Sequence, residues 1–114
     1  MIAVDIDGDG VNRTVSELSK TGPIEARVAD LSGEDRVQEL VTGVESTYGR
    51  IDVLFNNASI DGAVAKLVDY PIEVFDRVMA VNVRSIFLTM KYVLPGMMTP
   101  GTGAVINMGS TASF

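Results

Sequence analysis

The stretch Ile51-Asp52-Val53-Leu54-Phe55-Asn56-Asn57-Ala58 decides the fold of this chain, because a near-continuous apolar run passes directly into small polar residues. A short apolar run bounded by turn signals is typical of a strand that is buried on both faces of a sheet. Gly49-Arg50 leads into the run, and a polar loop follows as far as about Pro71. We therefore predict a buried strand over Ile51 to Phe55 whose carboxyl end opens onto a loop.

Three further apolar runs of this kind alternate with segments of helical periodicity. Strands are expected over residues 2–6, 24–29 and 104–108, and helices over residues 11–20, from Ser32 onward, and over 72–94. Ser32 fits the N-cap of the second helix, and Pro95-Gly96 predicts the end of the third. Because each strand is separated from the next by a helix, the order predicts an α/β fold with a parallel sheet of about four strands and three helices.

Composition and charge exclude several classes of function. The chain has 114 residues, 46% of them hydrophobic, which suits one globular domain. Its nine basic residues are scattered singly against fifteen acidic ones, so nucleic-acid binding is not expected. The absence of cysteine and histidine excludes thiolate chemistry, Cys/His zinc sites and a Ser-His-Asp triad within the chain. With no signal peptide and no apolar run near the ~20 residues that span a bilayer, we expect a soluble, cytoplasmic protein that binds no membrane.

Small or polar residues follow every expected strand, and ligands of parallel α/β sheets bind beyond these carboxyl ends. Asp5 there would accept hydrogen bonds from both hydroxyls of an adenosine ribose and repel a 2′-phosphate, which favours NAD over NADP. An N-cap for the next helix is the alternative role for Asp5. Asn57 and Ala58 would let a ligand approach the backbone closely, or form a plain Asx turn. Ser110 would polarise a substrate carbonyl or alcohol, or cap a turn.

Asn82 lies four residues from both Val78 and Ile86, and so falls on the apolar stripe of its helix. An unpaired buried amide costs about 1–3 kcal/mol, so Asn82 needs a hydrogen-bond partner inside the protein. A structural and a catalytic role for this amide are equally compatible with the sequence.

A competing motif overlaps the first strand end. Asp5-Ile6-Asp7-Gly8-Asp9-Gly10 matches the opening of a calcium-binding EF-hand loop. Position twelve of that loop, however, is Ser16 instead of glutamate, and a strand-like run precedes it where a helix is required. Turn chemistry is the better interpretation, and no metal site is expected.

Five segments, in order and spacing, resemble the short-chain dehydrogenase/reductase family. They are Val4-Asp5-Ile6, Ala29-Asp30-Leu31, Asp52 to Ala58, Val81-Asn82-Val83 and Val105 to Ser110. The resemblance covers essentially the whole chain. It implies a Rossmann-like doubly wound parallel sheet, truncated so that the central first strand is missing, and a partial NAD(P)-binding Rossmann domain over residues 1–114.

The resemblance also implies roles for individual residues. Asp5 and Ile6, with Asp30 and Leu31, would hold the adenosine of the cofactor, and Asn57 and Ala58 would contact the cofactor ribose through the backbone. Asn82 would order a water of the proton relay, and Ser110 would bind the oxygen of a small alcohol or ketone substrate. Ser59 departs from the glycine that usually follows Asn-Asn-Ala. The parent is expected to be a homo-dimer or tetramer, with the helix over residues 72–94 in its interface.

Two family motifs are missing from this chain: the glycine-rich Thr-Gly-x-x-x-Gly-x-Gly turn and the catalytic Tyr-x-x-x-Lys. The resemblance therefore implies an internal fragment of an NAD(H)-dependent oxidoreductase that interconverts a secondary alcohol and a ketone, with no activity when alone. Two unpaired apolar strand edges would leave it marginally stable or aggregated. The alternatives are a non-catalytic Rossmann-type nucleotide-binding or regulatory protein, and an acidic α/β module whose carboxylates bind a metal.

Overall fold

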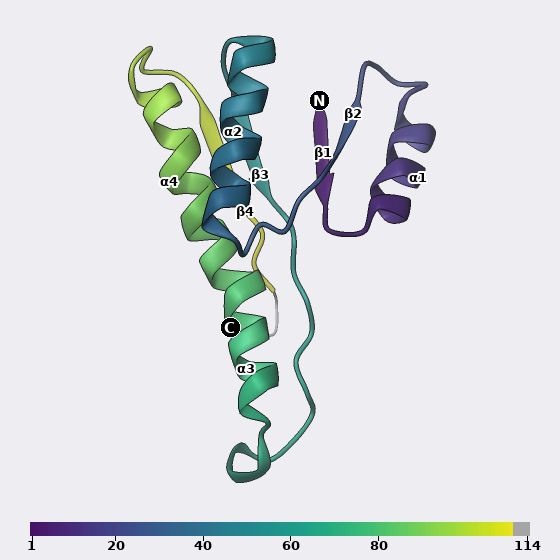
Figure 1. Ribbon diagram of the computed structural model, residues 1–114, viewed down its shortest axis with the longest axis vertical. Coiled ribbons are helices and arrows are strands. Elements are labelled where there is room, and N and C mark those ends of the chain that lie inside the picture. The colour runs from purple at the N-terminus through teal and green to yellow at the C-terminus, as the bar shows by residue number, and fades with distance from the viewer. Residues whose placement is uncertain (111–114) are drawn as a thin grey trace.

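A computed structural model describes residues 1–110 and shows short parallel strands that alternate with helices (Figure 1). The strands are β1 (Ile2–Asp5), β2 (Glu25–Val28), β3 (Val53–Asn56) and β4 (Ala104–Asn107). The helices are α1 (Gly8–Leu18), α2 (Glu34–Tyr48), the 3-10 turn η1 (Leu67–Asp69), α3 (Ile72–Met79), the π-helical segment η2 (Ala80–Arg84) and α4 (Ser85–Met98). The predicted α/β fold with four strands is confirmed, and each strand lies within two residues of its expected place.

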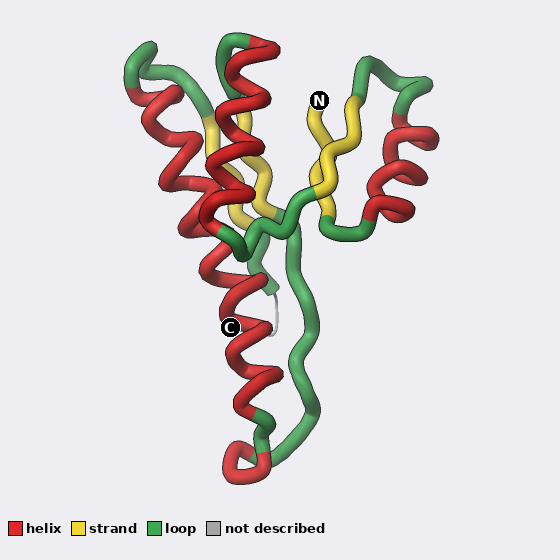
Figure 2. The backbone as a smooth tube through the Cα atoms, viewed as in Figure 1, coloured by secondary structure: helices red, strands yellow, loops and turns green. Residues whose placement is uncertain are grey.

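The strands form two separate parallel pairs, which stand apart in Figure 2. β1 pairs with β2, with Ile2 opposite Glu25, and β3 pairs with β4, with Val53 opposite Ala104. Among the described residues no strand pairing joins β1 to β3. One edge of β1 and one edge of β3 are thus unpaired, at the place where the family resemblance puts a further, central strand.

The hydrophobic core lies almost wholly around the β3–β4 pair. α2 and α4 pack on each other, and α4 packs on β3. The cluster of buried side chains comprises Val37, Val41, Leu88, Val93 and Met97. Leu54 and Val105 reach this cluster from the two strands, whereas Val53 and Phe55 alternate to the other face and are more than half exposed. The β3–β4 pair is therefore covered by helices on one face only.

The β1–β2 pair has a much smaller core. α1 packs on both strands, and Val11 is the one buried residue of that helix. Polar side-chain contacts connect this part of the chain to the rest: the Tyr48 hydroxyl donates to the Glu25 carboxylate at 2.5 Å, and Arg84 Nε donates to the Ser32 carbonyl at 3.1 Å. Both contacts are exposed, so the two parts are joined by polar surface contacts, by chain connectivity and by Leu31 of the connecting segment, which packs against the core cluster.

The long helix predicted over residues 72–94 is present, extends further to Met98 and contains one π-helical segment. It runs without a break through α3, η2 and α4, and the extended chain that leaves β3 descends beside its lower part (Figure 1). The expectation that Pro95-Gly96 ends the helix is wrong, since Pro95 lies inside α4 and the helix continues to Met98. Burial of Val93 and Met97 against the core on either side of Pro95 accounts for this continuation. None of the described helices is long and apolar enough to cross a membrane.

Two helix starts differ from the sequence prediction. Asp7, not Asp5, is the N-cap of α1, and its side chain accepts the Asp9 N–H at 3.1 Å. Helix α1 therefore begins at Gly8, within the stretch that resembles a calcium loop. Gly33, not Ser32, is the N-cap of α2, because the Ser32 hydroxyl donates to Asp30 instead.

Candidate functional site

The carboxyl ends of the strands meet in two groups, one for each strand pair. At the first group, Asp5 lies opposite Val28 and the Ala29 N–H donates to the Asp5 carbonyl at 3.0 Å, so Asp30 follows directly after this last backbone hydrogen bond. The Asp5 carboxylate accepts the Asp7 N–H at 3.0 Å, which holds it at the strand end with its side chain exposed. This turn, rather than a helix cap, is the local role of the Asp5 side chain.

Asp30 makes a turn of its own at the end of β2. One carboxylate oxygen accepts the Ser32 hydroxyl at 2.6 Å and the Ser32 N–H at 2.9 Å. These two hydrogen bonds, the hydroxyl first, hold the pKa of Asp30 below its ordinary value against a small opposing effect of burial, and the charge of Arg77 adds to the lowering. Asp30 is therefore a fixed anion at neutral pH.

Ile6 and Leu31 follow the two carboxylates and differ in exposure. Ile6 is 63% exposed, so an apolar surface is available beside Asp5. Leu31 is half-buried and packs against the core cluster that contains Val37. Part of the Leu31 side chain thus packs in the core, and only the exposed part of it is accessible to a ligand.

At the second group, two asparagines end neighbouring strands and bind each other. Asn56 and Asn107 are opposite in the β3–β4 register, and Asn56 Nδ2 donates to Asn107 Oδ1 at 2.8 Å. The chain then leaves β3 through Asn57 and Ala58, both exposed, and leaves β4 toward Ser110, also exposed. The Met108 N–H still donates to the Asn56 carbonyl at 3.0 Å, so the two exits begin side by side.

Asn82 lies in the π-helical segment η2 and is half-buried, as its place on the apolar stripe predicts. Its amide is paired twice with the backbone of a single residue: the Ile60 N–H donates to Asn82 Oδ1 at 2.8 Å, and Asn82 Nδ2 donates to the Ile60 carbonyl at 2.9 Å. The partner that the sequence required is therefore the loop after β3. Asn82 holds the descending loop against the helix, next to the segment that carries Asn57 and Ala58.

Two further polar residues bind Asn56 at the strand ends and were not predicted from the sequence: Thr89 of α4 and Asn107 of β4. The Thr89 hydroxyl donates a hydrogen bond to Asn56 Oδ1, and Asn107 Oδ1 accepts one from Asn56 Nδ2. A signal for them exists in the sequence: Thr89 separates the apolar run Ile86-Phe87-Leu88 from Met90, and asparagine ends two strands that a parallel sheet makes neighbours. Helical phase alone does not show that this threonine faces the strand ends.

The acidic stretch at Asp5, Asp7 and Asp9 has a local structural role. Asp5 and Asp7 each accept a backbone N–H of the turn that starts α1. Within residues 1–110, no group of three or more acidic side chains is arranged to hold a metal ion.

Comparison with known proteins agrees with this arrangement. The family model described as short chain dehydrogenase matches residues 1–114. The chain is 34% identical over 114 residues to a levodione reductase of Leifsonia aquatica, covering 97% of this chain and 43% of that protein. The crystal structure of an NAD+-bound xylitol dehydrogenase superimposes with a TM-score of 0.92 at 32% identity, covering 98% of this chain and 44% of the other.

A second solved structure, a metagenomic short-chain oxidoreductase in complex with NADP, superimposes with a TM-score of 0.91 at 28% identity, covering 96% of this chain and 50% of the other. The chain thus spans about half, or less, of the length of the proteins that it matches. Nicotinamide dinucleotides of both kinds occur among its structural neighbours.

Proposed function

Because this chain belongs to the short-chain dehydrogenase family, we propose that it is part of an oxidoreductase that interconverts a secondary alcohol and a ketone by hydride transfer. Residues 1–114 would form part of its NAD(P)-binding Rossmann domain. The observation that supports this most is the gathering of Asp5, Asp30, Asn57-Ala58 and Ser110 at the carboxyl ends of the parallel strands. The substrate would be a small molecule, and a location in the cytoplasm is part of the same proposal.

The exposed residues of the first group fit the adenosine part of a dinucleotide. The Asp5 carboxylate is held at the strand end by the Asp7 N–H, and would accept hydrogen bonds from the ribose hydroxyls. Exposed Ile6 beside it would offer the adenine an apolar surface, with Asp30 and the accessible part of Leu31 on the other side. When bound, the nicotinamide cofactor would accept or supply the hydride.

The residues of the second group would act on the nicotinamide side and on the substrate. The backbone of Asn57 and Ala58 would contact the cofactor ribose, and the Ser110 hydroxyl would donate to the substrate oxygen. Asn82 has both of its amide groups paired with Ile60, so its part would be to hold the loop and the π-helical backbone around a proton-relay water. The alcohol proton would pass to a tyrosine assisted by a lysine.

This chain does not contain that tyrosine-lysine pair. Tyr48, Tyr70 and Tyr92 are followed four residues later by Asp52, Val74 and Gly96. We therefore expect the 114-residue polypeptide to show no turnover by itself, whereas the complete protein that carries it oxidises secondary alcohols. The experiment is to assay both polypeptides with NAD and NADP on a panel of secondary alcohols and ketones. A complete protein that binds the dinucleotide but turns over none of them would instead favour a non-catalytic binding protein.

The cofactor preference rests on Asp5, whose negative charge would repel a 2′-phosphate. In the complete protein, we expect NAD to bind more tightly than NADP, and Asp5→Ala to reduce this preference at least tenfold. Asp9→Ala removes another exposed carboxylate, four residues later in the first turn of α1, and serves as the matched control. Titration calorimetry with each cofactor measures the ratio. Equal binding of NAD and NADP by the unchanged protein would contradict the preference.

Self-association through the long helix is a further part of the proposal. A shallow groove on this helix is lined by Asp76, Met79, Ala80, Val83, Arg84 and Phe87. Met79, Val83 and Phe87 are 41–63% exposed, and Asp76 and Arg84 lie four residues to either side of Ala80. In an antiparallel pair of helices related by a two-fold axis at Ala80, Asp76 would face Arg84 of the partner subunit.

The oligomeric state of the complete protein tests this surface. We expect a dimer or tetramer that Val83→Asp dissociates, because the substitution puts a carboxylate into the apolar centre of the pair. Met98→Asp alters an exposed methionine at the far end of α4 and should leave the assembly intact. Sedimentation velocity distinguishes the forms, and a monomeric unchanged protein would contradict the proposal.

A further inference from the structure

Thr89 is a buried hydroxyl within an otherwise apolar turn of α4. Only 4% of the residue is exposed, and its Oγ1 lies 2.8 Å from Asn56 Oδ1 and 3.1 Å from the Ile86 carbonyl. Both of these oxygens are only acceptors, so the single hydroxyl proton is donated toward them, and the shorter of the two contacts is the one with Asn56. The Thr89 hydroxyl is therefore the first donor of a directed chain of hydrogen bonds.

The chain continues through the two asparagines. With its oxygen facing Thr89, the Asn56 amide must turn its Nδ2 toward Asn107, whose Oδ1 accepts at 2.8 Å. That acceptance orients the Asn107 amide in turn, and its Nδ2 reaches the Met90 sulfur at 3.7 Å. One buried hydroxyl thus fixes which way two successive side-chain amides face.

The packing of the strands does not require this polar chain. The backbone ladder from Val53 and Ala104 to Asn56 and Asn107 already aligns β3 with β4. A valine would occupy the volume of Thr89 without burying a hydroxyl in an apolar turn, which carries a desolvation cost. The side chains add a contact at the last pair of the ladder, from which the two strands lead into Asn57-Ala58 and toward Ser110.

We propose that Thr89 is a positioning residue which, through Asn56 and Asn107, sets the spacing between the Asn57-Ala58 backbone and the strand that leads to Ser110. The inference rests on the proposed function, in which these two segments contact cofactor and substrate. Thr89 itself touches neither, and its effect is on geometry: the reacting groups stay in register because both strand exits are held by one hydrogen-bonded chain. Such alignment matters for hydride transfer because small displacements of reacting groups slow a reaction strongly.

Three variants of the complete protein test the proposal. Thr89→Val removes the hydroxyl at nearly constant volume, and Thr89→Ser restores it. Ser85→Ala is the matched control, since Ser85 is also 4% exposed, lies one turn earlier on α4, and donates only to the Val81 carbonyl of its own helix. We expect Thr89→Val to lower kcat on the order of tenfold with a smaller change in the substrate KM. Thr89→Ser should recover kcat to within about twofold, whereas Ser85→Ala should leave it near the unchanged protein.

A second measurement does not depend on activity. In nuclear magnetic resonance spectra of the same variants, Thr89→Val should shift the side-chain amide signals of Asn56 and Asn107 and the backbone amides of Asn57 and Ala58. Ser85→Ala should leave all four in place. If Thr89→Val does not fold, Asn107→Ala breaks the chain from its exposed end, and should shift the Asn57 and Ala58 amides and lower kcat in the same way.

The outcomes separate the two proposals. Unchanged amide signals and unchanged kcat in Thr89→Val, or in Asn107→Ala where the first variant does not fold, would overturn the positioning role. Shifted signals with equal losses in Thr89→Val and Ser85→Ala would also overturn it, because a general loss of helix packing would then explain both. If the complete protein turns over no alcohol or ketone, the proposed function fails, and the shifts of Asn57 and Ala58 alone decide whether Thr89 positions them.

Discussion

The two strand pairs of this chain differ in how much buried apolar surface supports them. The parts of the proposed ligand site that they carry therefore stand on units of different stability. We name the part formed by β3, β4, α2 and α4 the core unit, and the part formed by β1, β2 and α1 the edge unit. The core unit contains all five residues of the buried cluster, whereas Val11 is the one buried residue of α1 in the edge unit. Polar contacts such as Tyr48 with Glu25 join the two units.

The proposed site is divided in the same way. The edge unit and the turn after it carry Asp5, Ile6 and Asp30, the residues proposed for the adenosine part of the cofactor. The core unit and its exits carry Asn57, Ala58 and Ser110, proposed for the reacting part. The residues proposed for the reacting part thus stand at the exits of the better packed unit, and the residues proposed for adenosine stand on the unit with less buried apolar surface.

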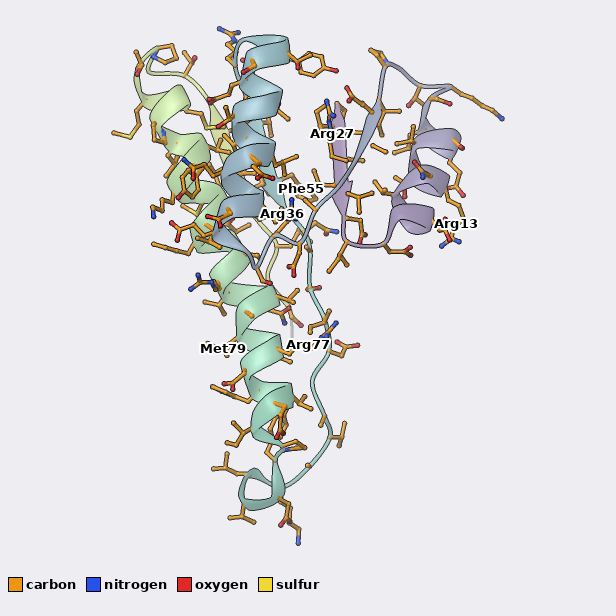
Figure 3. The ribbon with its side chains drawn as sticks, viewed as in Figure 1. Arg13, Arg27, Arg36, Phe55, Arg77 and Met79 are labelled. Atoms are coloured by element: carbon orange, nitrogen blue, oxygen red, sulfur yellow. The ribbon has the colours of Figure 1, made fainter. Side chains whose placement is uncertain are left out.

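The largest expected effect concerns the gap between the units. β1 and β3 each present an unpaired edge. On the face of β3 that no helix covers, Val53 and Phe55 are more than half exposed, and Phe55 is labelled in Figure 3. Exposed apolar edges favour association and lower stability. We expect the 114-residue polypeptide to aggregate or to unfold over a broad urea range, measured by circular dichroism and sedimentation velocity. A sharp two-state transition of a monomer would contradict this.

The second prediction compares one substitution in each unit. In the complete protein, Leu88→Ala should lower the free energy of unfolding by about 2–5 kcal/mol, since Leu88 is 2% exposed in the core cluster. Leu18→Ala, at a 38% exposed leucine of α1, should cost less than about 1 kcal/mol. Urea denaturation measures both. Equal losses would show that the edge unit is as tightly packed as the core unit.

The third prediction concerns the loop held by Asn82. Asn82→Ala leaves the Ile60 N–H and carbonyl without their partner in a partly buried place, and should cost about 1–3 kcal/mol. Hydrogen exchange of the Ile60 amide should become faster, with little change in the core unit. Asn12→Ala on the exposed face of α1 is the control. An Ile60 amide that exchanges at the unchanged rate would mean that the loop is held by other contacts.

The smallest effect is expected at Asp30. Its pKa is lowered mainly by the Ser32 hydroxyl, so the folded state holds the Asp30 proton less tightly than the unfolded chain does. The lowered pKa of Asp30 stabilises the folded state fully at pH values above the pKa of the unfolded chain, which is about 3.9. This stabilisation is lost as the pH falls below that value toward the folded pKa. Ser32→Ala should raise the pKa of Asp30 toward the ordinary value, read from the carboxyl carbon in a magnetic resonance titration. Ser16→Ala, on exposed α1, should leave that pKa in place.

Much of the fold was predictable because its signals are local. Each strand is a short apolar run that ends at a small or polar residue, and each helix has apolar periodicity. The errors arose where tertiary contacts override local propensity. Pro95 does not end α4, because Val93 and Met97 on either side of it are buried. Ser32 does not cap α2, because the Asp30 carboxylate takes its hydroxyl.

The positions of the candidate site residues were predictable, but their partners were not. Spacing alone showed that Asn82 faces inward and needs a partner. The partner, Ile60, lies 22 residues earlier in a loop without a periodic pattern. The roles of Thr89 and Asn107 were not predictable because both residues bind Asn56, which is 33 residues from the first and 51 from the second.

The sequence by itself determined the alternation of strands and helices and the residues that stand at the strand ends, including the stretch from Ile51 to Ala58. Apolar periodicity and turn residues act within a few positions, so they can be read along the chain. The tertiary structure alone decided that the strands divide into two pairs, that Asn82 pairs with the Ile60 backbone, and that Thr89 directs Asn56 and Asn107. These depend on hydrogen-bond geometry between residues far apart in sequence, which no local pattern encodes.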